Sequence, residues 1–120
     1  MESYRDLRVW QQGVELAVFC YEITKPFPKE ELFGMTSQIR RCASSVPANI
    51  AEGWGRQSTG DYIKFLRVAQ GSLKELETHV EICTRIRLLT NDQSIDLERQ
   101  TNSIGKMLAA LIRSLQKKTP

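Results

Sequence analysis

Apolar residues recur every three or four positions along most of this chain, a spacing that predicts amphipathic α-helices. The clearest run alternates steps of four and three and consists of Tyr62, Leu66, Ala69, Leu73, Leu76, Val80 and Cys83. A second run keeps the same spacing through Leu97, Thr101, Ile104, Leu108, Leu111 and Leu115. Such heptad seams indicate two long helices that pack against neighbours along most of their length.

The first part of the chain predicts two more helices. One runs from about Asp6 to Thr24, with the apolar stripe Leu7, Trp10, Val14, Ala17 and Tyr21, widened by Val18 and Ile23. The prolines of Lys25-Pro26-Phe27-Pro28 should end it, because a residue before proline avoids the helical region. The next helix begins just after Pro28 and carries the stripe Leu32, Met35, Ile39, Cys42, Ala43, Val46 and Ile50. Gly53 is expected to end this second helix as its C′ residue.

Residues suited to helix caps precede the two seam helices. Ser58 or Thr59 is the expected N-cap of the third helix, with Asp61 in a capping-box position, and Thr90-Asn91-Asp92 precedes the fourth. The loops are short, and no stretch of the sequence alternates like a strand. Short loops between long helices imply antiparallel neighbours. The sequence therefore predicts an all-α fold, an antiparallel up-down-up-down four-helix bundle that forms a single domain over residues 1–120.

Pro47 lies inside the second predicted helix. Its ring nitrogen carries no hydrogen, so the carbonyl of Ala43 loses its helical partner, a defect that costs roughly 3 kcal/mol in a helix interior. We therefore expect this helix to be kinked at Pro47. Asn49 and Glu52 are interpreted as a polar network that fixes the bend, with Arg8, Arg40 or Arg41 as a cation for Glu52. Direct contact of Asn49 and Glu52 with a ligand is the alternative.

The basic residues are unevenly distributed. The formal net charge is +3, but the segment from Arg99 to Lys118 carries five basic residues and no acid. On the two seam helices the cations fall opposite the apolar seams: Lys64, Arg67, Lys74 and Arg85 on the third helix, and Arg99, Lys106, Arg113 and Lys117 on the fourth. Two such stripes are typical of a surface that neutralises the phosphates of RNA or DNA. The alternatives are a solvated face with local pairs such as Glu81 with Arg85, or a protein partner.

Gly71 lies on the outward face of the third predicted helix, among these cations. A glycine inside a helix costs about 1 kcal/mol relative to alanine, so an outward one indicates close approach by another backbone, of a subunit or of a ligand. Apolar residues off the core seams are further candidates for contact between subunits: Val9, Phe19, Ile63 and Ile112. A structural oligomer with a polypeptide partner is therefore the alternative to a nucleic-acid-binding protein.

Catalytic chemistry is sparse in this sequence. It has one histidine, His79, and three cysteines without a CxxC pair, so neither a catalytic triad nor a four-ligand metal site is expected. His79 with Glu75 one turn earlier is interpreted as a surface pair, and the cysteines as reduced core residues. We expect no enzymatic activity, no cofactor and no bound metal.

The sequence also gives no indication of a membrane segment. No apolar run approaches the ~20 residues that span a bilayer. Charges of both signs precede the first apolar run, unlike a signal peptide. We therefore expect a cytoplasmic protein.

One segment carries a family resemblance. Arg40-Arg41 followed by Ser44-Ser45-Val46-Pro47-Ala48-Asn49-Ile50-Ala51-Glu52-Gly53 resembles the signature of the four-helix-bundle proteins encoded in ribosomal RNA intervening sequences. The opening Tyr4-Arg5-Asp6-Leu7-Arg8-Val9-Trp10 and the segments 61–66 and 69–78 resemble the same family. The likeness covers essentially the whole chain.

This resemblance implies a bundle that assembles as a ring-like homopentamer without known catalysis. The family is related to the accessory variability protein of diversity-generating retroelements, a basic pentamer that works with reverse transcriptase and nucleic acid. The resemblance therefore adds self-association, RNA or DNA, and a reverse transcriptase as expected partners. It assigns no catalytic residue.

Overall fold

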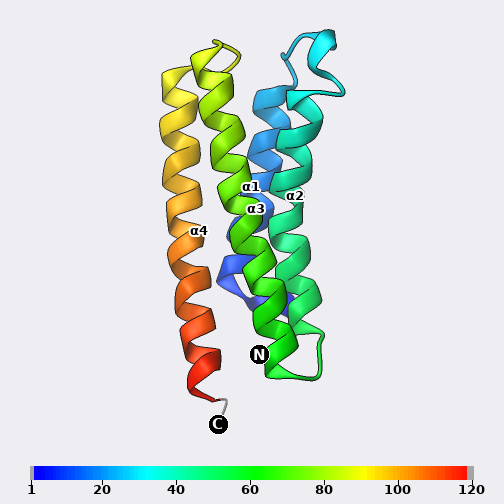
Figure 1. The fold of residues 1–120 in the computed structure, drawn as a ribbon, viewed down its shortest axis with the longest axis vertical. Helices are drawn as coiled ribbons and strands as arrows, with labels where there is room; N and C mark the ends of the chain where they lie inside the picture. Colours follow the sequence, from blue (N-terminus) through cyan, green and yellow to red (C-terminus); the bar gives the residue numbers. More distant parts are fainter. Residues whose placement is uncertain (1, 119–120) are drawn as a thin grey trace.

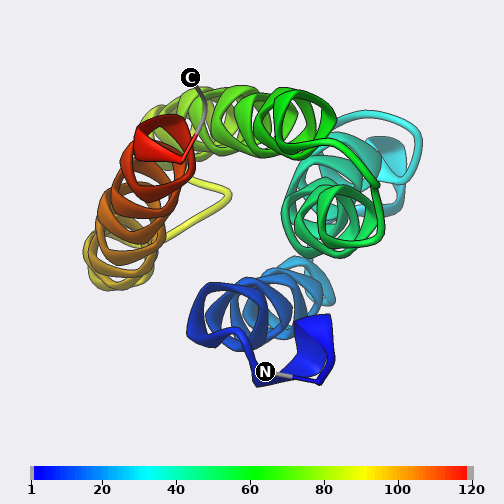
Figure 2. The ribbon, with the colours of Figure 1, turned by 90° about the horizontal axis from the view of Figure 1, so that it is seen from below.

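Four long helices follow one another with short connections in the computed structural model, which describes residues 2–118 (Figure 1). They are α1 (Arg8–Thr24), α2 (Met35–Trp54), α3 (Thr59–Arg85) and α4 (Asn91–Lys117), and two 3₁₀ helices, η1 (Tyr4–Asp6) and η2 (Lys29–Glu31), precede α1 and α2. Successive helices run in opposite directions, and each lies beside its neighbour in the sequence (Figure 2). The predicted antiparallel four-helix bundle is confirmed. Within residues 2–118, no helix combines the length and apolar character needed to cross a membrane.

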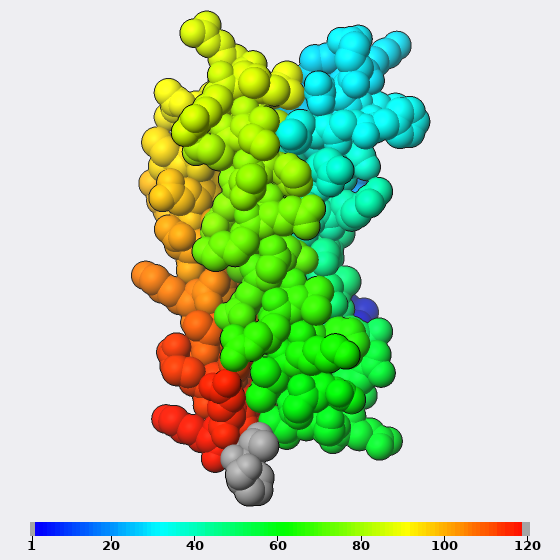
Figure 3. All heavy atoms as spheres, viewed as in Figure 1, coloured from blue at the N-terminus to red at the C-terminus, as the bar shows by residue number. Residues whose placement is uncertain are grey.

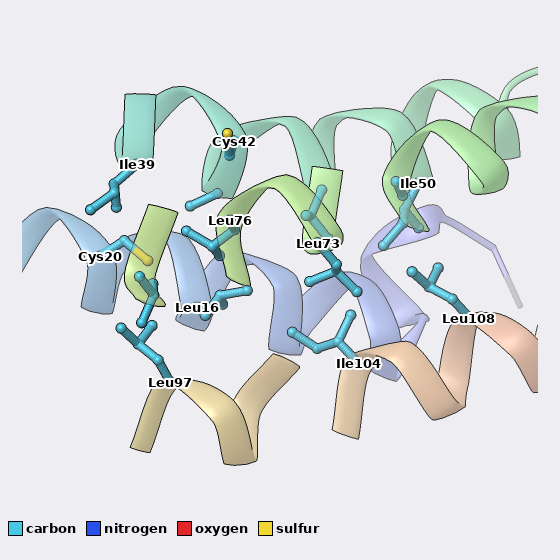
Figure 4. Packing of buried hydrophobic residues seen from close by; sticks show 14 of the residues in the cluster. Leu16, Cys20, Ile39, Cys42, Ile50, Leu73, Leu76, Leu97, Ile104 and Leu108 are labelled. Carbon is cyan, nitrogen blue, oxygen red and sulfur yellow. The ribbon is translucent and has the colours of Figure 1, made fainter. Parts of the chain in front are cut away.

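The heptad seams predicted for α3 and α4 form much of the core. Figure 4 shows Leu73 and Leu76 of α3 meeting Leu16 of α1 and Ile104 of α4 between the helices. Near its end α4 buries Ile112, whereas the predicted Leu111 is only partly buried. A straight α-helix has 3.6 residues per turn and drifts ~20° per heptad, which explains this shift of one position.

α1 packs on the core with a face that matches the predicted one only in part. Its buried residues are Val9, Gly13, Leu16, Cys20, Ile23 and Thr24. Of the predicted stripe, Leu7 and Ile23 are buried, Trp10 and Ala17 are partly buried against the core, and Val18 and Tyr21 are exposed by 52% and 45%. The prediction of this face is therefore right for Leu7 and Ile23 and wrong for Val18 and Tyr21.

Both predicted ends of α2 are wrong. The helix begins at Met35, whose N–H donates to Glu31 Oε1 at 3.0 Å, and the predicted core residue Leu32 is 52% exposed. At the other end α2 continues through Gly53 to Trp54, and Gly55 follows with φ −77°. Among the described residues no glycine has a positive φ, so the expected left-handed cap does not form.

The starts of α3 and α4 agree with the cap chemistry in the sequence. Ser58 Oγ accepts the backbone N–H of Asp61 at 3.1 Å at the start of α3. At the start of α4, Thr90 Oγ1 accepts from the N–H of Gln93, and the Gln93 side chain accepts from the N–H of Thr90. These bonds satisfy backbone donors that the first helical turn leaves free, which fixes where each helix begins.

Candidate functional site

The predicted basic residues of α3 and α4 all lie exposed on the surface. α3 and α4 are antiparallel neighbours joined by a short connection, so the first half of α3 lies beside the second half of α4. Figure 3 shows these two halves side by side near the C-terminal end of the chain. The structure thus brings together cations that are far apart in the sequence.

A shallow groove of about 660 Å³ runs between α3 and α4. Arg67 and Lys74 of α3 and Lys106 of α4 line it, together with Gly71 and Gly105. A β-carbon on either glycine would meet nothing within 4 Å. No packing inside the bundle therefore requires glycine at these positions, and their small size leaves the groove open to a ligand.

Further cations lie three, four or seven residues along the same helices, which places them on the same helix faces as the cations of the groove. We call the resulting set the α3/α4 basic surface, which consists of Lys64, Arg67, Lys74, Lys106, Arg113 and Lys117. Within residues 59–74 and 99–117 the only acid is Asp61. Glu77 also lines the groove, and its Oε2 lies 3.3 Å from Lys74 Nζ. Most of the positive charge of this surface has no acidic neighbour on the same stretch of helix.

Two of the predicted basic residues lie apart from this surface. Arg85 is at the opposite end of α3, where its Nε donates to Glu81 Oε2 at 2.7 Å, as the solvated-face alternative expected. Arg99 lines a depression between α1 and α4 with Arg8 and Lys106. The sequence did not indicate Arg8 as part of a basic surface, because its helix carries no other cation at helical spacing.

An apolar groove of about 630 Å³ lies on the outside of α1 and α2, and we call it the α1/α2 apolar groove. It contains most of the stripe that the sequence assigned to the core: Trp10, Val14, Ala17, Val18 and Tyr21 from α1, with Pro47, Ala48 and Ala51 from α2. The guanidinium of Arg40 lies 4.6 Å from the centre of the Tyr21 ring at its rim. An apolar hollow of this kind on a small protein is typical of a docking surface.

The residues predicted to make contacts between subunits are mostly part of the core instead. Val9 and Ile112 are 5% and 3% exposed, so this prediction is wrong for both. Phe19 and Ile63 are partly buried against the core. All four residues belong to core faces that are wider than the predicted apolar stripes.

Polar residues around Pro47 stabilise the bundle rather than form a separate site. Asn49 Nδ2 donates to the carbonyl of Ser45 at 2.8 Å and to its Oγ at 2.9 Å, and Ser45 Oγ lies 2.8 Å from Ser72 Oγ of α3. The predicted structural role of Asn49 is confirmed. Glu52 is not part of this network, because it is exposed and lies 3.6 Å from Arg56.

Arg40, one of the three cations predicted as a partner for Glu52, makes other contacts. Arg40 Nε donates to Thr24 Oγ1 of α1 at 2.9 Å, and Thr24 in turn donates to the carbonyl of Cys20 at 2.7 Å. Arg40 therefore links α2 to the end of α1. The charge of Glu52 needs no buried partner, because its side chain is 57% exposed.

Cys42 of α2 lies close to Glu75 and His79 of α3. The Cys42 sulfur, a carboxylate oxygen of Glu75 and a ring nitrogen of His79 all lie within 4.8 Å of one another. His79 Nε2 is 3.5 Å from Glu75 Oε2, but only 17% of the His79 side chain is exposed. The predicted surface pair is therefore wrong for His79. Burial and, next, the Glu75 carboxylate raise the pKa of the Cys42 thiol to about 12, against a smaller opposite effect of Arg41.

The fold and these surfaces define an antiparallel four-helix bundle with a basic groove on one helix pair and an apolar groove on the other. Residues 5–110 match the 23S rRNA-intervening sequence protein family, and the chain belongs to this family.

One solved structure is similar over most of the chain. It is a protein of unknown function from the S23 ribosomal protein family of Bacteroides thetaiotaomicron, with 29% sequence identity and a TM-score of 0.78. The match covers 87% of this chain and 97% of that protein. A search of the curated proteins gave no match.

Proposed function

We propose that this chain is a non-enzymatic subunit of a homo-oligomer that binds nucleic acid through the α3/α4 basic surface. The observation that carries the proposal is the convergence of Arg67, Lys74 and Lys106 from two helices on one groove, where Glu77 is the only acid among the described lining residues and is paired with Lys74. Cations spaced along a groove suit a phosphate backbone, because each neutralised phosphate releases condensed counterions.

The two glycines of the groove support contact with a backbone. Gly71 of α3 and Gly105 of α4 both line the α3/α4 groove, and neither adds a side chain to it. A nucleic-acid strand that lies there would bring its phosphates near Arg67, Lys74 and Lys106. The exposed glycines, which cost helix stability, are then accounted for by the ligand that they admit.

The α1/α2 apolar groove supports self-association. A second copy of the chain that covers Val18 and Tyr21 would remove this apolar groove from water. The family resemblance implies a ring of five subunits, and five charges of +3 give about +15 in one assembly. Such a charge would attract nucleic acid over a distance set by the salt concentration.

The family suggests RNA as the first nucleic acid to test. Its name refers to intervening sequences of 23S rRNA. The related accessory protein of diversity-generating retroelements extends the proposal to DNA and to a reverse transcriptase as partner. The buried free cysteines suit a reducing compartment such as the cytoplasm, which is where we place the protein.

The α1/α2 apolar groove also favours a second candidate function. A structural oligomer that binds a polypeptide would place an apolar segment of its partner against Trp10, Val18 and Tyr21. In that case the α3/α4 basic surface would be solvated, and nucleic acid would not compete with the partner.

The test measures affinity for one RNA duplex and one DNA duplex of the same sequence across a salt series. Arg67→Gln with Lys106→Gln removes two cations from the α3/α4 groove, and Arg85→Gln removes one from the far end of α3. Each lost phosphate contact should lower the slope of log K against log salt by about 0.9. The double variant should therefore bind more weakly with a slope reduced by up to about 2, and Arg85→Gln should match wild type.

Three results would contradict the proposal. They are no binding at low salt, a salt-independent affinity, or equal weakening by the double variant and by Arg85→Gln.

A further inference from the structure

Cys42, Glu75 and His79 form a cluster of metal-ligand side chains that the proposed function does not use. Glu75 and His79 lie one turn apart on α3, and Cys42 faces them from α2. Cys20, which Figure 4 shows on α1, is not a member of this cluster. Each of the three residues contributes a different type of donor atom: sulfur, carboxylate oxygen and imidazole nitrogen.

The hydrogen bonding of His79 is incomplete in a way that a ligand would satisfy. Both ring nitrogens are buried, and neither has a hydrogen-bond partner among the described residues. A buried polar atom without a partner costs free energy comparable to a lost hydrogen bond. Native structures rarely keep such atoms. Within residues 2–118, His79 Nε2 makes only a 3.5 Å ion-pair contact with Glu75 Oε2 and no hydrogen bond, which indicates that a ligand binds between the ring, the thiol and the carboxylate.

The distances suit a small divalent cation. Zn²⁺ forms bonds of about 2.0–2.3 Å to these donors, which places tetrahedral ligand atoms about 3.3–3.8 Å apart. The three ligand atoms lie within 4.8 Å of one another, and the Glu75–His79 pair is already at 3.5 Å. Side-chain rotations that close the remaining gap by about 1 Å would complete the three-ligand set.

We infer that Cys42, Glu75 and His79 bind a divalent transition-metal ion of the Zn²⁺ class between α2 and α3. The thiol loses its proton to solvent as the metal–sulfur bond forms, and the thiolate and carboxylate together balance the charge of the ion. Glu75 is 56% exposed, so the ion reaches the site from solvent and keeps a fourth position for water. The bound ion ties α2 to α3 and stabilises the folded bundle.

The test uses Co²⁺ as a spectroscopic substitute for Zn²⁺ in the full chain, stripped of metal and kept reduced. We expect one Co²⁺ per chain, with a thiolate-to-metal charge-transfer band that Zn²⁺ abolishes by displacement. Loss of a supporting group alone costs about 10–100-fold in metal affinity, so Cys42→Ser should weaken binding by at least about 100-fold and remove the band. His79→Gln should weaken binding similarly but leave the thiol in place.

Cys83→Ala is the matched control, because Cys83 is also a buried cysteine but lies outside the cluster. It should bind Co²⁺ like wild type. Zn²⁺ should raise the melting temperature of wild type and of Cys83→Ala but not that of His79→Gln. Circular dichroism checks that each variant folds. If Cys42→Ser does not fold, His79→Gln decides the test.

The inference is wrong if folded wild type gives no charge-transfer band. It is equally wrong if folded His79→Gln binds Co²⁺ as tightly as wild type, or if Cys83→Ala loses the band.

Discussion

A β-carbon at Gly53 of α2 would lie 2.9 Å from Tyr62 Cδ1 and 3.0 Å from Phe65 Cβ of α3. The backbone carbonyl of Tyr62 is only 3.1 Å away, so α3 cannot yield by moving a side chain alone. Gly53 is therefore a packing residue inside α2. Its position in the sequence, just before the loop, resembles that of a helix cap.

We expect Gly53→Ala to lower the free energy of unfolding by about 1–3 kcal/mol, because it overpacks the α2–α3 contact. Gly105→Ala is the matched control, since a β-carbon there meets nothing within 4 Å. It should raise the free energy of unfolding by up to about 1 kcal/mol through helix propensity. Urea unfolding measures both, and equal effects of the two substitutions would contradict the packing argument.

Cys20 is fully buried in the core, and its burial, with a smaller effect of Cys42, raises the pKa of its thiol from 9.0 to about 12. Below pH 9 the thiol is neutral in both the folded and the unfolded chain, so it makes no difference to stability. Above pH 9 only the unfolded chain ionises, and stability is lost until the folded thiol also ionises near pH 12.

pH 10 lies one unit above the unfolded pKa of 9.0, and one unit corresponds to about 1.4 kcal/mol. At pH 10 the ionisation of the unfolded thiol should therefore lower the free energy of unfolding by about 1.4 kcal/mol. Cys20→Ala removes the thiol, so the difference in stability between wild type and variant should change by that amount between pH 8 and pH 10. Denaturant unfolding in the presence of a chelator measures it. A difference that stays constant with pH would show that the Cys20 thiol ionises freely in the folded protein.

At the scale of the elements, the start of α4 depends on the reciprocal bonds between Thr90 and Gln93. We expect Thr90→Ala to lower the free energy of unfolding by about 1 kcal/mol, because the N–H of Gln93 loses its acceptor. Thr90→Ser keeps a hydroxyl in the same place and should have a much smaller effect. Thermal unfolding of the two variants tests the cap, and equal losses would assign the effect to the threonine methyl group instead.

α1 illustrates how one helix serves two surfaces. Leu16 and Cys20 face the core, while Val18 and Tyr21 face the α1/α2 apolar groove on the other side. Pro47 lies inside α2 beside Gly13 of α1, where a β-carbon would be 3.3 Å from Pro47 Cβ. The glycine lets α1 approach the proline closely, which positions the outer residues of both helices to form the groove.

At the scale of the whole molecule, the α1/α2 apolar groove predicts self-association. Val18→Glu places a charge in the groove and should reduce the mass in solution to that of one chain, because burying the carboxylate against a second copy is unfavourable. Val68→Glu is the control, since Val68 of α3 is exposed to a similar extent, 46% against 52%, but lies outside the groove. Light scattering after size-exclusion chromatography measures the mass.

If Val18→Glu has the same mass in solution as the wild-type oligomer, the α1/α2 apolar groove is not the interface between subunits. A monomeric Val68→Glu would place the interface on α3 instead.

The helices, their order and the seams of α3 and α4 could be predicted from the pattern of residues alone. The caps at Ser58 and Thr90 and the family could be predicted in the same way. These features depend on interactions within a few residues, because helix periodicity and cap hydrogen bonds are local in the chain. Prediction of the C-terminal end of α2 failed because Gly53 packs against Tyr62 and Phe65 of α3, which the local sequence does not show.

The packing of the helices fixes which face of α1 enters the core and which cations share the α3/α4 groove. It also brings Cys42 close to Glu75 and His79. The sequence shows the spacing of Glu75 and His79 but gives no sign that a cysteine of another helix faces them. The rotation and axial position of one helix against another depend on how side chains interlock over the whole contact. A local sequence pattern does not contain these long-range contacts. Both grooves and the metal-ligand cluster therefore form only when the helices pack together.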